Sequence, residues 1–196
     1  MISNNDVVLV DENDNPIGTL EKVAAHLGDG KLHRAISVWI VRNTKSEARN
    51  SKQILNSNDS KHKQNLEILI TKRSEKKMLW PGYWSNSVCS HPKEGESYVE
   101  AGERRLLEEV GIKCKPEFLY KFTYREKFED VGSEHETTGV QVGKYDGEVN
   151  THPDEMADYR WVGWEELMEW VGKEREIFTP WSLRMMENLE LEKVLR

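Results

Sequence analysis

Cys89 and His91 lie two residues apart in the segment WSNSVCSHPKEGE, residues 84–96. A thiol and an imidazole at this spacing could bind a metal ion, could act as a nucleophile with its base, or could be a packed thiol beside a surface histidine. The sequence shows no triad or oxyanion-hole pattern around them, which argues against acyl transfer. In a polar turn flanked by aromatic residues, the thiol can be tuned as a proton donor or acceptor. The second cysteine, Cys114, fits a small buried apolar side chain, and we assign it no role.

Arginines and glutamates recur at helical spacing in the segment ESYVEAGERRLLEEVGIKC. Arg104 precedes Glu108 by four residues and Arg105 precedes Glu109 by four, so each pair shares a helix face. Taken alone, the pattern is typical of a solvated helix with ordinary ion pairs. Carboxylates before and along such a helix could also surround a hard cation such as Mg2+, which would bridge to substrate phosphates. Both interpretations are open at this point.

The composition restricts the class of protein that can carry these groups. The chain has 196 residues and a formal net charge of -7, whereas a nucleic-acid-binding surface needs an excess of Lys and Arg. It has no apolar run of the roughly 18 to 20 residues that span a bilayer, and the first residues, MISNNDVVLVDEND, do not resemble a signal peptide. We therefore expect a cytoplasmic protein with reduced cysteines that binds neither nucleic acid nor a membrane. We expect a monomer or a weak homodimer.

Short runs of β-branched and aromatic residues dominate the chain and predict strands. VVLVD and NPIGTLE flank the turn ENDN and predict a hairpin, and AISVWIV predicts a buried strand. Ser97 and Glu100 form a capping-box pattern that starts a helix, and Gly111 stops it. Because strands and helices do not alternate regularly, the sequence favours an α+β fold over a doubly wound sheet. Further strands are predicted at EILITKR, FLYKFTYR, TTGVQVGKY and DYRWVGW, and further helices at EKVAAHL, EELMEWVG and residues 179–195, the last with Thr179 as its cap and Pro180 in its first turn.

The segment 43–66, NTKSEARNSKQILNSNDSKHKQNL, is polar and rich in Asn, Ser and Lys. It cannot bury enough apolar surface to order itself, so we expect a flexible insertion between two strands. The chain length suits one domain, and we expect residues 1–196 to form a single unit that carries this insertion.

Residues 90–112 resemble the Nudix box, whose pattern is G-x5-E-x7-R-E-U-x-E-E-x-G-U with U apolar. Two positions depart from it, because Ser90 replaces the first glycine and Arg105 replaces the glutamate after the arginine. In the hydrolases of this superfamily, that glutamate helps to bind the metal that drives pyrophosphate cleavage, so a cation there argues against simple hydrolysis. The matching residues are Glu96, Arg104, Leu106, Glu108, Glu109, Gly111 and Ile112.

The segment WPGYWSNSVCSHP resembles the cysteine motif of the type 1 isopentenyl-diphosphate isomerases, which have the Nudix fold. The resemblance extends from about Thr19 to Trp181 through the segments TLEKVAAH, LHRAISVW, TYRE, GSEHET and FTPW. It implies a Nudix-type mixed sheet with flanking helices, one of which is the helix of the Nudix box. Its breadth makes it more specific than a lone box.

This resemblance implies two metal sites. Each histidine taken alone is more often an ordinary surface or capping residue, and the two glutamates could lie in a charged loop. In the family, five matching residues bind one divalent ion, and a shell of imidazoles and carboxylates suits Mn2+, Zn2+ or Mg2+. Glu109 and the main-chain carbonyl of Cys89 are implied to hold a Mg2+ that bridges to the substrate diphosphate. The five residues are His26, His33, His91, Glu134 and Glu136.

The resemblance also implies a substrate site, although each of its residues taken singly fits surface charge or core packing. Four basic positions hold a diphosphate, which suits point charges and planar guanidinium groups. The indole of Trp181 would stabilise a developing carbocation by about 2 kcal/mol or more when desolvated. Tyr124 would form a hydrogen bond near Glu136. The four basic residues are Lys22, Arg73, Lys77 and Arg105.

The implied reaction is the isomerisation of isopentenyl diphosphate to dimethylallyl diphosphate, a step of isoprenoid biosynthesis. It requires two acid–base groups on opposite sides of a small apolar pocket, and the resemblance assigns them to Cys89 and Glu136. Water must be excluded, because a tertiary cation would otherwise be trapped as an alcohol. Two alternatives stay open: a Nudix pyrophosphohydrolase of a nucleoside or prenyl diphosphate, and a non-catalytic diphosphate-binding module with the same fold.

Overall fold

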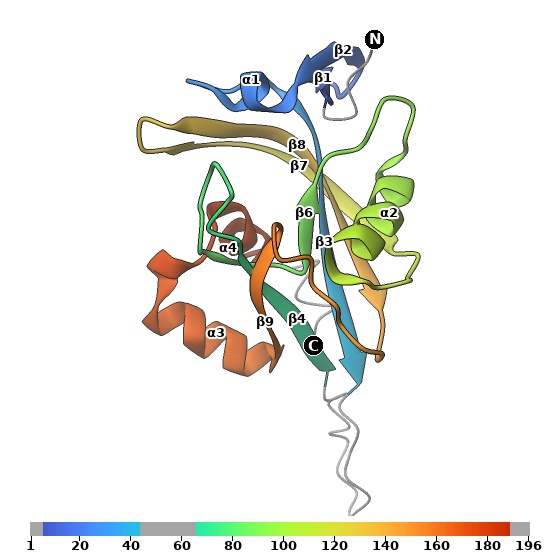
Figure 1. The fold of residues 1–196 in the computed structure, drawn as a ribbon, viewed down its shortest axis with the longest axis vertical. Helices are drawn as coiled ribbons and strands as arrows, with labels where there is room; N and C mark the ends of the chain where they lie inside the picture. Colours follow the sequence, from blue (N-terminus) through green and yellow to red (C-terminus); the bar gives the residue numbers. More distant parts are fainter. Residues whose placement is uncertain (1–5, 44–65, 189–196) are drawn as a thin grey trace, which may run out of the picture.

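The computed structural model describes residues 6–43 and 66–188. They form a mixed β-sheet with helix α2 on one side and helices α3 and α4 on the other (Figure 1). This is the α+β fold that the sequence predicts. The elements are, in chain order, β1 (Asp6–Val10), β2 (Pro16–Glu21), α1 (Lys22–His26), β3 (His33–Asn43), β4 (Leu66–Arg73), β5 (Trp84–Ser85), β6 (Val88–Ser90), α2 (Tyr98–Val110), β7 (Glu117–Phe128), β8 (Gly132–Lys144), β9 (Met156–Gly163), α3 (Trp164–Lys173), the 3-10 turn η1 (Arg175–Ile177) and α4 (Pro180–Met186).

Strand β3 lies at the centre of the sheet and pairs along both of its edges. Its β-branched and aromatic residues are buried over most of its length, as expected for a strand that is covered on both faces. Along one edge it runs parallel to β8, from His33 opposite Glu136 to Val41 opposite Lys144. Along the other edge it pairs in turn with β1, β6 and β4. The sheet is extended by β7 beside β8 and by β9 and β5 beside β4.

Successive side chains of β3 point to opposite faces of the sheet and enter two separate hydrophobic cores. Ile36 and Ile40 pack in one core with Leu106 of α2. Trp39 points the other way and packs with residues of α3 and α4, among them Met185. The odd-numbered residues of β3 therefore share the face that α4 covers.

The N-terminal hairpin is fastened to the rest of the protein through its turn. β1 and β2 pair antiparallel, as the sequence predicts. Asp14 in the turn has a left-handed backbone with φ 66°. Its carboxylate accepts hydrogen bonds from Arg34 Nε (2.7 Å), Lys121 Nζ (2.8 Å) and the Tyr98 hydroxyl (3.1 Å), which belong to β3, β7 and α2. Because α1 follows β2 directly, this clamp also places α1.

Helix α2 begins and ends where the sequence predicts. The Ser97 hydroxyl accepts a hydrogen bond from the main-chain N–H of Glu100, and the Glu100 carboxylate accepts one from the N–H of Ser97, which completes the capping box. Gly111 ends the helix with a left-handed backbone of φ 69°. A side chain at Gly111 would be strained, and its Cβ would lie 3.1 Å from Asn150 Cβ.

The C-terminal helix is shorter than predicted. Pro180 starts α4 as expected, but the helix ends at Met186, so the prediction of a helix over residues 179–195 is wrong for residues 187 and 188. Residues 189–196 lie outside the described part of the chain. Thr179 occupies the cap position, but among the described residues its side chain bonds to other hydroxyls and not to the main chain of α4.

The predicted insertion falls largely on residues that the structure does not describe. Of the range 43–66, Asn43 and Leu66 are described, and they pair with each other at the ends of β3 and β4. The insertion, and with it the single-domain boundary, stays a prediction. Within the two described ranges, no helix has the length and apolar character needed to cross a membrane.

Candidate active site

Three histidines and two glutamates come together at the start of β3. His33 lies in register with Glu136 of β8, and Glu134 is two residues earlier on the same face of β8. His26 comes from α1, and His91 follows β6. One ligand atom from each of the five residues lies within 4.8 Å of all the others. The structure therefore brings together all five residues that the resemblance implies as metal ligands, and the two glutamates lie in a strand and not in a charged loop.

The imidazoles are oriented by the main chain. His26 Nδ1 lies 2.6 Å from the carbonyl of Lys22, and His33 Nδ1 lies 2.6 Å from the carbonyl of Lys31. Each Nδ1 therefore carries a proton and each Nε2 faces the cluster, that of His26 at 2.9 Å from Glu134 Oε2. His33 Nε2 is buried and has no hydrogen-bond partner among the residues that the structure describes. A divalent cation would satisfy this nitrogen, so the group is able to hold a metal ion.

The Cys89 side chain is held in one orientation by hydrogen bonds. Its thiol donates to Asn86 Oδ1 (2.8 Å), and its sulfur accepts a bond from Trp181 Nε1 (3.1 Å). The Asn86 amide is itself fixed, because its Nδ2 donates to two main-chain carbonyls, each at 3.0 Å. Burial raises the pKa of Cys89 to about 11, although hydrogen bonds with Ser37 and Ser85 act in the opposite direction. Cys89 is therefore a protonated thiol, and Asn86 is a partner to which the sequence reasoning assigned no role.

Glu136 faces the histidines with one oxygen and two hydroxyl groups with the other. Oε1 lies 3.2 Å from His91 Nε2 and 3.6 Å from His33 Nε2. Oε2 accepts hydrogen bonds from the Tyr124 hydroxyl (2.8 Å) and from Thr138 Oγ1 (3.1 Å). Burial alone would raise the pKa of Glu136, but the contacts with His33, His26 and Tyr124 together outweigh it and lower the pKa to about 2. The structure thus places Tyr124 beside this carboxylate and adds Thr138, for which the sequence gives no local signal.

Cys89 and Glu136 line the same cavity, whose empty space of about 610 Å³ includes open solvent at its mouth. Its wall combines these ionisable groups with apolar side chains, including Met78, Leu79 and Trp181. A cavity in which many ionisable groups converge beside an apolar patch suits a small charged molecule with an apolar part.

Three of the four basic residues implied for the diphosphate, Lys22, Arg73 and Lys77, also line this cavity. Burial lowers the pKa of Lys22, and the positive charge of Lys77 lowers it further. Arg73 also holds the loop between β4 and β5, because its Nε and Nη2 donate to two main-chain carbonyls of this loop at 3.0 and 2.7 Å. Arg105 is not part of the cavity wall but lies beside it on α2.

Arg105 and Glu109 form a buried pair on the inner side of α2. Glu109 is fully buried, and its Oε1 lies 2.8 Å from Arg105 Nε and 2.6 Å from Nη2. Its Oε2 has no hydrogen-bond partner in the part of the chain that is described. Burial raises the pKa of Glu109 against the opposing charge of Arg105. Glu109 and Cys89, the two residues implied for the Mg2+, both line a second, small cavity, together with Glu155 and others.

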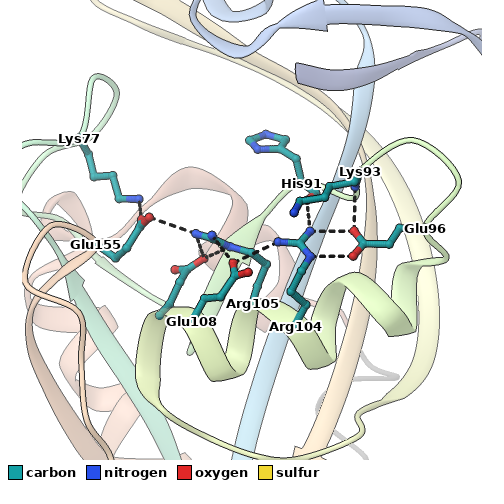
Figure 2. Close-up of polar contacts among 9 residues, drawn as sticks. Lys77, His91, Lys93, Glu96, Arg104, Arg105, Glu108 and Glu155 are labelled. Carbon is teal, nitrogen blue, oxygen red and sulfur yellow. Dashed lines mark hydrogen bonds and ion pairs between the residues drawn. The ribbon is translucent and has the colours of Figure 1, made fainter. Parts of the chain in front are cut away.

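Two further carboxylates near α2, those of Glu96 and Glu108, are paired with arginines (Figure 2). Arg104 donates to both oxygens of Glu96 (2.6 and 2.7 Å) and to a main-chain carbonyl after β6 (3.2 Å). Glu108 lies 3.1 Å from Arg104 Nη1 and 2.7 Å from Arg105 Nη1. The interpretation as ordinary ion pairs therefore holds for Glu96 and Glu108, while Glu109 keeps an oxygen free for a cation.

Comparison with known proteins defines the class to which this fold and site belong. A family model of the NUDIX domain matches residues 54–185. A structure from Deinococcus radiodurans, 18% identical, has a TM-score of 0.60 and covers 86% of this chain and 89% of that chain. The MutT protein of Methanosarcina mazei Go1 is 19% identical and has a TM-score of 0.55, and the match covers 83% of this chain and 91% of that chain. At these identities the likeness concerns the fold alone, and with the family model it defines a NUDIX domain protein.

More similar relatives narrow the class. The isopentenyl-diphosphate Delta-isomerase 1 of Photorhabdus laumondii is 41% identical over 177 residues, which cover 89% of this chain and 89% of that protein. The isopentenyl-diphosphate Delta-isomerase of Pectobacterium atrosepticum is 37% identical, and the match covers 90% of this chain and 86% of that protein. The chain belongs to the isopentenyl-diphosphate Delta-isomerase family, which confirms the resemblance found in the sequence.

Proposed function

We propose that this chain catalyses the isomerisation of isopentenyl diphosphate to dimethylallyl diphosphate. The observation that carries the proposal is that Cys89 and Glu136 line one cavity, beside the group of three histidines and two glutamates. Family membership supports it, because the relatives are named for this activity. The reaction adds one proton to the terminal alkene carbon and removes one from the methylene carbon on the other side of the branched carbon, so the formula is unchanged.

Cys89 and Glu136 are the two groups that exchange these protons. One donates to the double bond and the other accepts from the methylene carbon, and the roles are exchanged in the reverse direction. The thiol is fixed by the bond that it donates to Asn86 and the bond that it accepts from Trp181, and the carboxylate by the bond that it accepts from Tyr124. Groups that are already held in a reactive geometry lose little entropy in the transition state, which lowers the activation barrier.

Two divalent ions complete the proposed site. The three histidines with Glu134 and Glu136 would hold one Mn2+, Zn2+ or Mg2+. The positive charge of the bound ion would favour the ionised form of Glu136. Glu109, with its free buried oxygen, and the main-chain carbonyl of Cys89 would hold a Mg2+ together with the diphosphate.

The rest of the cavity suits the two ends of the substrate. Lys22, Arg73 and Lys77 in the wall, with Arg105 beside it, would bind the diphosphate. Trp181 presents its indole in the same wall, where a desolvated ring stabilises a cation by about 2 kcal/mol or more. We further propose that the chain acts in the cytoplasm as a monomer or weak homodimer on this small molecule, in isoprenoid biosynthesis.

The test is to incubate the purified chain with isopentenyl diphosphate in 2H2O and to follow the allylic product by NMR. The proposal expects dimethylallyl diphosphate with deuterium in the methyl group, loss of turnover with a chelator, and recovery when Mg2+ and Mn2+ are added back. Release of inorganic phosphate without an allylic product would refute it and indicate a NUDIX hydrolase. Binding of the substrate with neither product would indicate a non-catalytic module.

A further inference from the structure

Two of the cations implied for the diphosphate reach the same carboxylate from different parts of the fold. Lys77 lies in the loop after β4 and Arg105 lies on α2, and each forms an ion pair with Glu155, immediately before β9 (Figure 2). We propose that Glu155 is a positioning residue of the diphosphate site, which holds Lys77 and Arg105 so that both point toward the space where a diphosphate binds. This inference rests on the proposed function, because it takes these cations as the diphosphate ligands.

The geometry gives each carboxylate oxygen one cation. Oε1 of Glu155 lies 3.1 Å from Arg105 Nη2, while Oε2 accepts from Lys77 Nζ. The main chain of Glu155 is fixed as well, because its carbonyl accepts a bond from the N–H of Ser74 (3.0 Å) and its own N–H donates to the carbonyl of His152 (2.9 Å). Glu155 therefore joins the loop that carries Lys77 to the helix that carries Arg105.

The two cations need such a partner for different reasons. Lys77 is a point charge on a flexible stem, so an acceptor is required to select one rotamer. Arg105 is already held by Glu109, with 2.6 Å between Arg105 Nη2 and Glu109 Oε1, and Glu155 bonds the same nitrogen from the second side. The structure therefore predicts that Lys77 depends on Glu155 more than Arg105 does.

The charges around Glu155 also explain why a carboxylate is required there. Lys22 and Lys77 line the same cavity, and Lys77 and Arg105 share the carboxylate of Glu155. Burial lowers the pKa of Lys22, and the positive charge of Lys77 lowers it further. Burial alone would raise the pKa of Glu155, but Lys77 and Arg105 outweigh it and lower the pKa to about 2. Glu155 is thus ionised under all working conditions and offsets repulsion between the cations before the substrate arrives.

The test compares Glu155→Gln, which keeps the shape and removes the charge, with Asp154→Asn as a matched control. Asp154 is one residue away and pairs with Lys76, but that pair is exposed (58% and 72% of each side chain) and outside both cavities. Binding of inorganic pyrophosphate with Mg2+ is measured by calorimetry, and kcat and KM by NMR. We expect E155Q to raise the Kd for pyrophosphate and the KM about tenfold, with kcat within about twofold, and D154N to change neither.

Several results would overturn the inference. A Kd and KM of E155Q within about twofold of the wild type would show that Glu155 does not position the cations, and a lower Kd would show that it competes with the diphosphate. A loss of kcat at constant KM would place Glu155 in the chemistry. In a Lys77→Met background, E155Q must raise the Kd for pyrophosphate by a smaller factor than it does alone, because one of the two cations that Glu155 holds is then missing. Equal factors in both backgrounds contradict the proposal.

The design separates this inference from the proposed function. If the wild type binds pyrophosphate but yields no allylic product, the proposed function fails, and the calorimetric comparison still decides the role of Glu155. If E155Q loses its near-ultraviolet circular dichroism, Glu155→Asp replaces it: its carboxylate is one methylene shorter and cannot reach both cations. An intermediate rise of Kd in E155D supports the inference, and an unchanged Kd contradicts it.

Discussion

Replacing Asp14 by Asn should loosen the clamp of the N-terminal hairpin without changing its shape. Asn adopts the left-handed backbone of this position as readily as Asp, so the substitution keeps the backbone and removes the charge together with one acceptor oxygen. The Asp14 side chain is 9% exposed and bonds Arg34 and Lys121, whose side chains are 22% and 47% exposed. The bond to Arg34 is the better shielded of the two and should carry most of the effect.

The expected magnitude follows from this exposure. A hydrogen bond between ionised groups contributes roughly 1.5 to 3 kcal/mol when shielded, and a solvent-exposed pair roughly 0 to 1 kcal/mol. Because an Asn oxygen still accepts one bond, we expect D14N to lower the free energy of unfolding by about 2 kcal/mol, which is about 4 to 8 °C in Tm for a chain of this size. The loss should be accompanied by weaker metal binding, since α1, which carries His26, follows this hairpin.

The pH dependence of this loss has a defined sign. Burial alone would raise the pKa of Asp14, but Lys121, Arg34 and Tyr98 outweigh it and lower the pKa below its usual range. The stabilisation is therefore complete above the unfolded pKa of about 3.9 and is lost as the pH falls through the folded value. Thermal unfolding followed by circular dichroism should show the full difference between wild type and D14N at pH 7 and a smaller one below about pH 4.

A suitable control is Asp29→Asn, because Asp29 forms an exposed pair with Arg125 and should leave Tm unchanged within about 1 °C. If D14N melts at the wild-type temperature at pH 7, the clamp does not stabilise the fold. A difference that grows as the pH falls would refute the assigned charge state of Asp14.

Three further substitutions test the site. Cys89→Ala should keep the wild-type circular dichroism and lower turnover by about 10³-fold or more, measured by NMR; appreciable turnover would exclude Cys89 from proton transfer. His33→Asn should weaken metal binding about 10- to 100-fold in calorimetric titrations, because His33 Nε2 points into the cluster and has no hydrogen bond among the described residues, only the 3.6 Å contact with Glu136 Oε1. Tyr124→Phe removes the 2.8 Å bond to Glu136 and should lower kcat about 10- to 100-fold; an unchanged kcat would make Tyr124 a packing residue.

Local patterns in the sequence were sufficient for individual elements, and the candidate site residues came from the family resemblance. The capping box at Ser97 and the glycine at Gly111 fix the ends of α2, because each acts through its immediate neighbours. The alternation of Glu134 and Glu136 places both on one face wherever the strand lies. The family resemblance added the histidines and the cysteine, which no periodicity would have selected.

Tertiary structure decided how these groups meet. The parallel register of β3 with β8 sets His33 opposite Glu136, and the antiparallel register of β7 with β8 sets Tyr124 opposite the same residue. Asn86 is only three residues from Cys89, but its amide is fixed in part by the carbonyl of the distant Val38. Glu155 contacts Lys77 and Arg105 only because the fold brings their distant segments together. The sequence by itself determined which side chains exist and which share a strand or helix face, since short-range sterics and hydrogen bonds settle that. Which side chains contact each other across strands and loops was decided by the register of the sheet and the position of the loops. Both depend on the packing of the whole core.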